Sequence, residues 1–284
     1  MTDTNITGST VGLKQITEVS STNPWRFSEH PGVVSSLTIA GLFVLWFLAT
    51  NLNWVDTLFL PAPQQLFESL ITLFSQGYID TTLGQHISAS LMRVLSALTL
   101  SLITAISLGI FMGLNPIVRA VFAPLIDFYR PIPPLAYLPL IVIWFGIGEF
   151  SKILLIFLAI FAPLVISSAE SVRRIDSNRI QAVRCLGASR FQVIRFVVLP
   201  SIFPDLVTGL RIALGMGWST LVAAELIAAN HGLGFMVQSA SQFLATDVVI
   251  AGILLIALIA LVIELGLRRV QKQFANWSIY DHRR

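Results

Sequence analysis

The sequence predicts an all-α integral membrane protein with six transmembrane helices. Three observations carry this prediction: the composition, the lengths of the apolar runs and the distribution of the basic residues. Of the 284 residues, 55% are hydrophobic and only 12% are charged, about half of the roughly 25% charged residues of a typical soluble domain. A soluble fold needs more charge on its surface, and a disordered chain has fewer aromatic residues, so both classes are excluded.

Six apolar segments are long enough to cross a membrane. A hydrocarbon core about 30 Å thick needs about 20 apolar residues in a helix. No long water-soluble segment separates the six, and the single Cys185 excludes an internal disulfide and a cysteine metal cluster. The predicted spans are 33–50, 91–114, 120–145, 153–171, 201–229 and 248–267.

The basic residues predict the orientation of these spans. If the N-terminus is cytoplasmic, most of the 18 Lys and Arg residues lie on the cytoplasmic side, and Lys152 alone lies in an outer loop. Six spans then return the C-terminus to the cytoplasm. We expect a cytoplasmic tail at 1–32, which lacks the features of a signal peptide. A transmembrane domain at 33–270 and a second cytoplasmic tail at 271–284 follow.

The third predicted span, 120–145, is irregular. Each interior proline removes a backbone hydrogen bond and crowds the preceding turn. Irregular backbone at membrane depth is tolerated where protein or a water-filled cavity covers it. We therefore expect this span to lie inside the bundle and to line a pathway; the alternative is a kinked helix that only packs on its neighbours. Its polar and helix-breaking residues are Pro124, Asp127, Arg130, Pro131, Pro133, Pro134 and Pro139.

The loop at about 176–196, between the fourth and fifth predicted spans, has the most specific spacing. A short helix is expected to end at Gly187, because glycine adopts the left-handed conformation at little cost. A second short helix follows. The pair predicts a compact projection that can dock in a groove on a cytoplasmic partner, whereas the alternative is an ordinary basic loop that ends in a helix cap.

This loop resembles the cytoplasmic "EAA" loop of ABC importer membrane subunits. The family pattern is Glu-Ala-Ala, three residues, Gly, nine residues, Ile, one residue and Leu-Pro. Gln181 stands in place of the Glu, and Val183 and Val197 are conservative departures. The resemblance implies an ATPase-coupling loop that contains Gln181, Ala182, Val183, Gly187, Ala188, Ser189, Leu199 and Pro200.

Further stretches, at 129–149, 209–229, 232–240 and 243–249, are similar to permeases of the nitrate, sulfonate and taurine importer family. The resemblance covers about 56–270. It implies a methionine-importer-like (type I) ABC importer permease fold in the bacterial inner membrane and a translocation path formed by two copies. It also implies two ATPase subunits and a periplasmic or lipid-anchored substrate-binding protein. Taurine is the implied substrate, with other aliphatic sulfonates and nitrate or bicarbonate as alternatives.

Several other functions lack their sequence signatures. No Gly-Lys dipeptide occurs, so the chain has no Walker A phosphate loop. We expect ATP and Mg on a separate ATPase chain, no cofactor or metal on this one, no enzymatic activity and no nucleic-acid partner. An ion-coupled carrier or a channel remains the alternative outside the ABC class, although neither needs a docking loop.

Charges within the spans are candidates for the translocation path because a buried charge is costly and is usually paired or functional. Arg130 either contacts a sulfonate or pairs with an acid such as Asp127. Arg211 is expected to be an interfacial or a paired structural arginine, with a contact in the path as the alternative. Glu225 either contacts the ammonium group of taurine or neutralises the charge of an arginine. Arg93 is expected to snorkel at the outer edge. The candidate path residues are Tyr129, Arg130, Trp144, Arg211, Trp218 and Glu225.

Overall fold

The computed structural model describes residues 31–52 and 54–274. Within them the regular elements are helices, and an isolated bridge pairs Tyr78 with Thr81. The chain divides into two compact units, Met1–Leu48 and Ala49–Arg284. The all-helical prediction is therefore confirmed for the part of the chain that is described.

Helix α1 (Pro31–Asn51) corresponds to the first predicted span. Its segment Val34–Asn51 is long and apolar enough to cross a membrane, and nearly all of its described side chains are exposed. An apolar helix without its own buried face suits a lipid environment.

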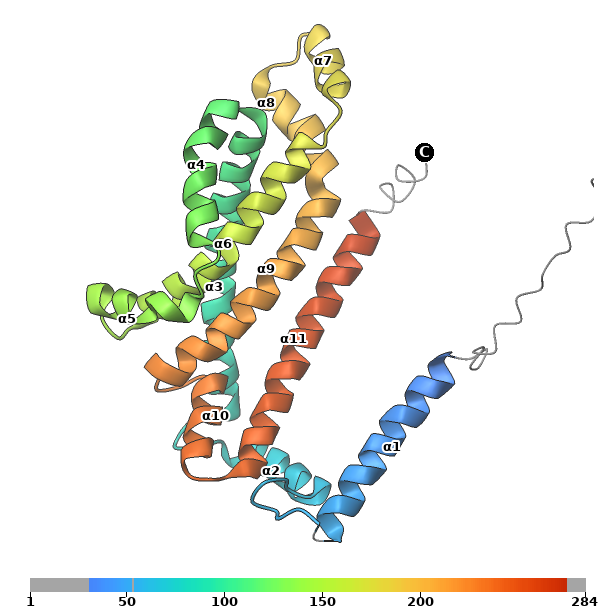
Figure 1. Ribbon diagram of the computed structural model, residues 1–284, viewed down its shortest axis with the longest axis vertical. Helices are drawn as coiled ribbons and strands as arrows, with labels where there is room; N and C mark the ends of the chain where they lie inside the picture. Colours follow the sequence, from blue (N-terminus) through green and yellow to red (C-terminus); the bar gives the residue numbers. More distant parts are fainter. Residues whose placement is uncertain (1–30, 53, 275–284) are drawn as a thin grey trace, which may run out of the picture. The chain divides into compact units, whose positions relative to one another are not determined.

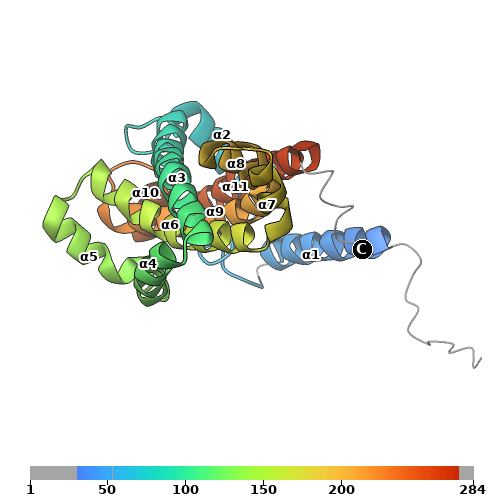
Figure 2. The ribbon, with the colours of Figure 1, turned by 90° about the horizontal axis from the view of Figure 1, so that it is seen from above.

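Four long helices form the centre of the second unit. Helix α6 packs against α3 and α9, and α11 contacts α9 (Figures 1 and 2). Each contains a stretch that can span a membrane, which confirms the second, fourth, fifth and sixth predicted spans. Their bounds are α3 Leu83–Leu114, α6 Glu149–Arg173, α9 Leu199–Ala228 and α11 Thr246–Phe274.

Small residues bring α3 and α6 into close contact. A Cβ placed on Gly109 would lie 2.4 Å from the Ser168 Cβ and 2.8 Å from the Val165 carbonyl oxygen. Close approach of this kind gives the van der Waals packing that contributes to helix association inside a bilayer, where the hydrophobic effect offers no driving force. The core continues from this contact through Ile156 and Ile160, both fully buried.

The third predicted span is broken. Helices α4 (Pro116–Tyr129) and α5 (Pro134–Phe145) meet at a bend of 100°, because three prolines fall within or beside the short link between them. The expectation that this span lies inside the bundle is wrong for the single chain. Only Leu138 and Ile141 of α5 are buried, where they pack against residues of α6 and α9, and most of the other α5 side chains are exposed (Figure 1).

The fifth span begins earlier than the predicted residue 201. Helix α8 (Arg190–Val193) runs through a five-residue π-helical stretch, Ile194–Val198, directly into α9. The continuous helical segment Arg190–Ile227 is long and apolar enough to cross a membrane as one span. The expected second short helix of the loop is thus the first turn of a membrane helix, so movement of the loop and of α9 is mechanically linked.

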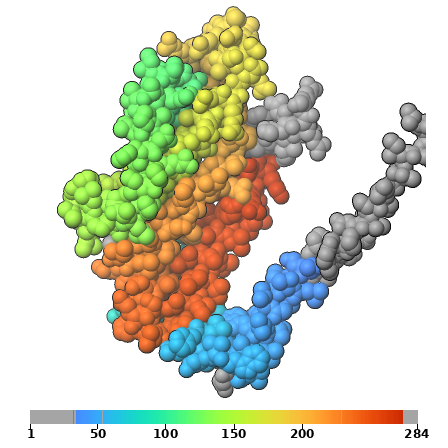
Figure 3. Space-filling view, viewed as in Figure 1, coloured from blue at the N-terminus to red at the C-terminus, as the bar shows by residue number. Residues whose placement is uncertain are grey.

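The short helices gather at the two ends of the long ones. Helix α7 (Ser177–Cys185) lies with α8 at one end, and α2 (Pro63–Gln76) and α10 (Leu233–Gln242) lie at the other (Figures 1 and 3). Both α2 and α10 pack against α11. Helices of this length are too short to cross a bilayer, so apolar runs of about 20 residues do not predict them.

The two predicted tails lie mostly outside the described residues. Of the first, 1–32, only Pro31 and Gly32 are described, and they form the start of α1. Of the second, 271–284, only residues 271–274 are described, and they form the last turn of α11.

Candidate docking loop and transport path

The turn after α7 has the geometry that its sequence predicts. Gly187 has φ +86°, and its N–H donates to the Arg184 carbonyl over 2.9 Å. The Ala188 N–H donates to the Val183 carbonyl over 3.3 Å. This pair of bonds is a Schellman motif, which satisfies the last carbonyls of the helix and turns the chain sharply. The expected helix end at Gly187 is confirmed.

The start of α8 is held as firmly. The Ser189 hydroxyl accepts a bond from the Gln192 N–H over 3.3 Å, and the Gln192 side-chain oxygen accepts from the Ser189 N–H over 2.7 Å. This reciprocal arrangement is a capping box. At the other end of the loop, the Asp176 carboxylate accepts from the Asn178 N–H and caps α7. Hydrogen bonds therefore cap both ends of α7 and the start of α8.

Apolar side chains anchor one face of the loop and leave the other bare. Val193 and Val198 are buried in a small core that also includes Val172 of α6. On the outer face Leu186 is 87% exposed, and Phe191 is exposed as well. Bare apolar side chains on a fixed projection suit a docking surface. Leu186 and Phe191 are not among the predicted coupling residues, although large apolar residues close to Gly187 in a basic loop are a signal for a docking surface.

Six residues of the predicted coupling set lie on this projection, and the other two, Leu199 and Pro200, are the first residues of α9. Val183 and Ala188 are half-buried and contact the anchoring core. The remaining members are exposed: Gln181, Ala182, Gly187, Ser189, Leu199 and Pro200.

Two cavities meet beside Arg130. One has a volume of about 340 Å³ and the other about 510 Å³, and Arg130, Pro163 and Ile212 line both. Their walls come from the break between α4 and α5, from α6 and from α9. Tyr129 lines the larger cavity, and its hydroxyl donates to the Leu158 carbonyl over 3.2 Å. Of the candidate path residues, the structure therefore brings Tyr129 and Arg130 to one groove.

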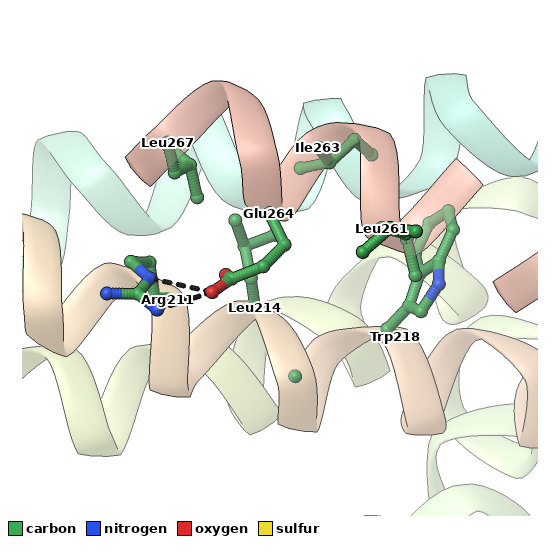
Figure 4. Close-up of a pocket in the computed structure, with 9 residues that line it drawn as sticks. Arg211, Leu214, Trp218, Leu261, Ile263, Glu264 and Leu267 are labelled. Atoms are coloured by element: carbon green, nitrogen blue, oxygen red, sulfur yellow. Dashed lines mark hydrogen bonds and ion pairs between the residues drawn. The ribbon is translucent and has the colours of Figure 1, made fainter. Parts of the chain in front are cut away.

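Arg211 and Trp218 lie elsewhere, in a cavity of about 390 Å³ between α9 and α11 (Figure 4). The Arg211 Nε donates to Glu264 Oε1 over 2.9 Å, and the same oxygen accepts from Arg268. This pairing supports the structural role expected for Arg211. The Trp218 indole Nε1 is buried and has no hydrogen-bond partner among the described residues. Except for the ion pair, the labelled side chains around it are apolar (Figure 4).

Glu225 and Arg93 form a buried ion pair. Glu225 is fully buried and Arg93 is 1% exposed, and the Arg93 Nη1 lies 2.6 Å from Glu225 Oε1. The Arg93 Nε also donates to Glu149 Oε2 over 2.6 Å, and Lys152 binds the same carboxylate. The expectation that Arg93 snorkels to the interface is therefore wrong, because two carboxylates hold it inside. Of the two roles open for Glu225, the structure supports that of balancing an arginine.

The backbone around Glu225 completes this site. Its carboxylate accepts from the Ser90 hydroxyl and from the Gly234 N–H, each over 2.8 Å. Gly232 has φ +133°, and a Cβ there would lie 2.5 Å from the carboxyl carbon of Glu225. The glycine therefore lets the chain leading into α10 close over the buried charge. The network joins α3, α6, α9 and α10 at the end opposite α7.

Trp144, the remaining candidate, lies on α5 and is 65% exposed. Its ring packs edge-on against Phe145 and lines neither cavity beside Arg130. No group of three or more potential metal-ligating side chains occurs among the described residues. The candidate path residues thus divide among a groove, a second cavity, a buried network and an exposed helix.

Comparisons with known proteins give a consistent picture. Residues 105–276 match the family model for the binding-protein-dependent transport system inner membrane component. The chain is 55% identical over 255 residues to the taurine transport system permease protein TauC of Escherichia coli (strain K12), covering 89% of this chain and 93% of the relative. It is 32% identical over 242 residues to SsuC of the same organism, whose name assigns it to aliphatic sulfonate transport, covering 85% and 90%.

A solved structure shares the fold. The MetNI methionine ABC transporter in inward-facing conformations matches with a TM-score of 0.58 and 18% sequence identity, covering 68% of this chain and 95% of the matched chain. At that identity the likeness concerns the fold alone, and it confirms the methionine-importer-like architecture expected from the sequence.

Proposed function

We propose, since this chain belongs to the family of binding-protein-dependent transport system inner membrane components, that it is the membrane-spanning permease of an ATP-driven taurine importer. The identity of 55% to a taurine permease over most of the chain supports the substrate. Permeases for other aliphatic sulfonates are the nearest alternative, and nitrate or bicarbonate permeases are a further one.

The loop at 176–196 is the observation that carries this function. It is capped at both ends, anchored to the bundle and continuous with α9, and it presents Leu186 and Phe191 to the outside. An ATPase subunit that receives this projection can move α9 when it binds and hydrolyses ATP with Mg. An ion-coupled carrier or a channel needs no such projection.

The assembly that we propose has two copies of this chain, two ATPase subunits and one substrate-binding protein. Helix α5 exposes the apolar side chain of Ile143, and Ile147, just after the end of α5, is also exposed. A second copy of the chain can cover these apolar side chains. The ATPases dock at the end that carries α7, which is the cytoplasmic face of the inner membrane. The binding protein, periplasmic or lipid-anchored, approaches the end that carries α10.

This orientation assigns the remaining parts of the chain. Residues 1–32 and 271–284 form cytoplasmic tails, and 33–270 form the permease domain. The basic residues close to α7 agree with the cytoplasmic assignment, because positively charged loops are retained on that side. They are Arg173, Arg174, Arg179, Arg184, Arg190 and Arg195.

Labelling of Cys185 tests the docking role directly. It is the single cysteine of the chain and is exposed in the loop. We expect a maleimide to label it rapidly in the permease alone and at least fivefold more slowly in the complex with the ATPase. The matched control carries Cys185→Ser with Ser75→Cys on α2, at the opposite end, and is labelled equally in both states. Equal labelling of Cys185 in both states would contradict the docking role.

A further inference from the structure

We infer that the two cavities beside Arg130 form a substrate-contact groove for a zwitterion. Arg130 provides the contact for the anionic group, and Asp205 provides the contact for the cationic group. The inference rests on the proposed importer function and adds a binding site within the permease itself, separate from the binding protein that delivers the substrate.

The groove follows α9 for much of the membrane thickness. Asp205 and Thr208 line the smaller cavity, Ser219 and Thr220 line the larger one, and Arg130 lines both. From Asp205 to Thr220 the rise along a helix is about 22 Å at 1.5 Å per residue. A hydrocarbon core is about 30 Å thick. Two neighbouring, partly polar cavities along this length of α9 can guide a small polar molecule past the apolar core.

The groove carries one unpaired charge of each sign. Arg130 and Asp205 form no ion pair with any of the described residues, whereas Glu170 and Arg174 in the same wall lie 3.7 Å apart and balance each other. Ionisable side chains in membrane-spanning segments mark substrate paths where they face a water-filled cavity. One cation and one anion on the same wall complement a molecule that carries both signs.

The chemistry of the two groups fits an aminosulfonate. A guanidinium presents several N–H donors in a plane, which match the oxygens of a sulfonate or a carboxylate. A carboxylate accepts hydrogen bonds from an ammonium group. The Ser167 hydroxyl adds a neutral polar contact to the same cavity, and it reaches the wall because residue 209 is glycine: a Cβ there would lie 2.1 Å from its oxygen.

The other charged candidates are already engaged. Glu225 is fully buried, and its carboxylate is bonded to Arg93, Ser90 and the Gly234 N–H. Arg211 is bonded to Glu264 in the separate cavity between α9 and α11. We therefore assign the ammonium contact to Asp205 rather than to Glu225.

Binding to this groove is expected to be weak, because both charges are partly open to solvent and exposed ion pairs contribute little. Weak binding suits a path from which the substrate must leave. Saturation-transfer NMR on the permease–ATPase complex without the binding protein detects such binding. The probes are taurine, ethanesulfonate, which lacks the ammonium group, and ethylamine, which lacks the sulfonate.

We expect a saturable taurine signal from the parent complex. Arg130→Gln should lower the taurine and ethanesulfonate signals at least fivefold. Asp205→Asn should lower the taurine and ethylamine signals and leave that of ethanesulfonate within twofold. Arg119→Gln and Asp127→Asn are the matched controls, since both side chains are exposed on α4 and line neither cavity, and they should leave every signal unchanged. Unchanged melting temperatures exclude misfolding.

The outcomes separate this inference from the proposed function. ATP-dependent taurine uptake is measured on the same preparation after the binding protein is added. If uptake is normal and the parent gives no taurine signal, or if the control variants lose signal as Arg130→Gln and Asp205→Asn do, the groove is not the site. If the parent complex neither takes up taurine nor hydrolyses ATP in response to the loaded binding protein, the proposed function itself fails.

Discussion

Gly187 acts through its backbone conformation alone. Its φ is +86°, and no atom lies within 4 Å of a Cβ built there. The left-handed conformation costs most residues about 1–2 kcal/mol, asparagine less, and β-branched residues resist it most. We predict that Gly187→Val lowers uptake and ATPase co-purification severalfold without loss of membrane insertion.

The matched variant is Gly187→Asn. It adds a side chain of similar size in the same open space, and we expect it to keep at least half of the parent activity. Equal loss in both variants would indicate a steric rather than a conformational role, and normal uptake by Gly187→Val would remove Gly187 from coupling.

Arg130 and Arg211 differ in their partners, and their substitutions should differ in kind. We predict that Arg130→Gln lowers taurine uptake severalfold at normal stability, because its guanidinium is unpaired in the groove. Arg211→Gln should change uptake less than twofold, because Glu264 keeps its bond to Arg268. Uptake is measured at matched amounts of assembled complex. A larger loss from Arg211→Gln would show that the path follows the cavity between α9 and α11.

At the scale of elements, the buried network holds the end that carries α10. Removal of one partner of a buried ion pair costs about 3–5 kcal/mol, because the other charge remains buried. We predict that Glu225→Gln strongly lowers the melting temperature of the purified complex, since Arg93 then loses its buried carboxylate and keeps the partly exposed Glu149 and the His231 carbonyl as partners. Glu264→Gln, in a partly exposed pair, should lower it far less. Similar shifts from both variants would contradict the assigned role of the network.

The contact between α3 and α6 depends on Gly109. A Cβ there would lie 2.8 Å from the backbone oxygen of Val165, which cannot move without displacing α6. Gly109→Ala should therefore lower the melting temperature, although alanine favours a helix more than glycine does. Gly84→Ala on the same helix meets no atom within 4 Å and serves as the control. A neutral Gly109→Ala would mean that the two helices pack less tightly than described.

The elements differ in how well the sequence predicts them. Long apolar runs predict the long spans, because nothing else in a small protein needs so many consecutive apolar residues. The prolines in 131–134 predict an irregular third span, but the direction of its bend is set by packing against α6 and α9. The short α2 and α10 carry no span signal and are missed.

The candidate site was predictable where the information is local. The spacing around Gly187 predicts the turn, because a helix end depends on a few neighbouring residues. The fate of Arg93 was not predictable, since its partners Glu149 and Glu225 lie 56 and 132 positions away in the sequence. Arg211 and Arg130 are both charges within predicted spans, and the sequence gives no reason to separate them. They lie in different cavities because of long-range contacts such as that of Arg211 with Glu264.

At the scale of the whole molecule, the features divide by position along the long helices. The loop that contains α7 lies at one end of the long helices, and α10 lies at the other (Figure 1). The buried ion network lies at the end that carries α10, and residues of α9 between the two ends line the groove beside Arg130. Because α8 continues into α9, a movement imposed on the loop reaches the wall of the groove directly. This arrangement suits a subunit that converts the closure of an attached ATPase pair into access on alternate sides of the membrane.

Reconstitution in vesicles tests this account most directly. The purified chain alone should neither bind ATP nor accumulate taurine, because it has no phosphate-binding loop and its docking loop has no partner. Addition of its ATPase and binding protein should produce ATP-dependent taurine uptake, with hydrolysis stimulated only by the loaded binding protein. Vesicles that contain this chain alone and accumulate taurine on an ion gradient would contradict the account and identify an ion-coupled carrier.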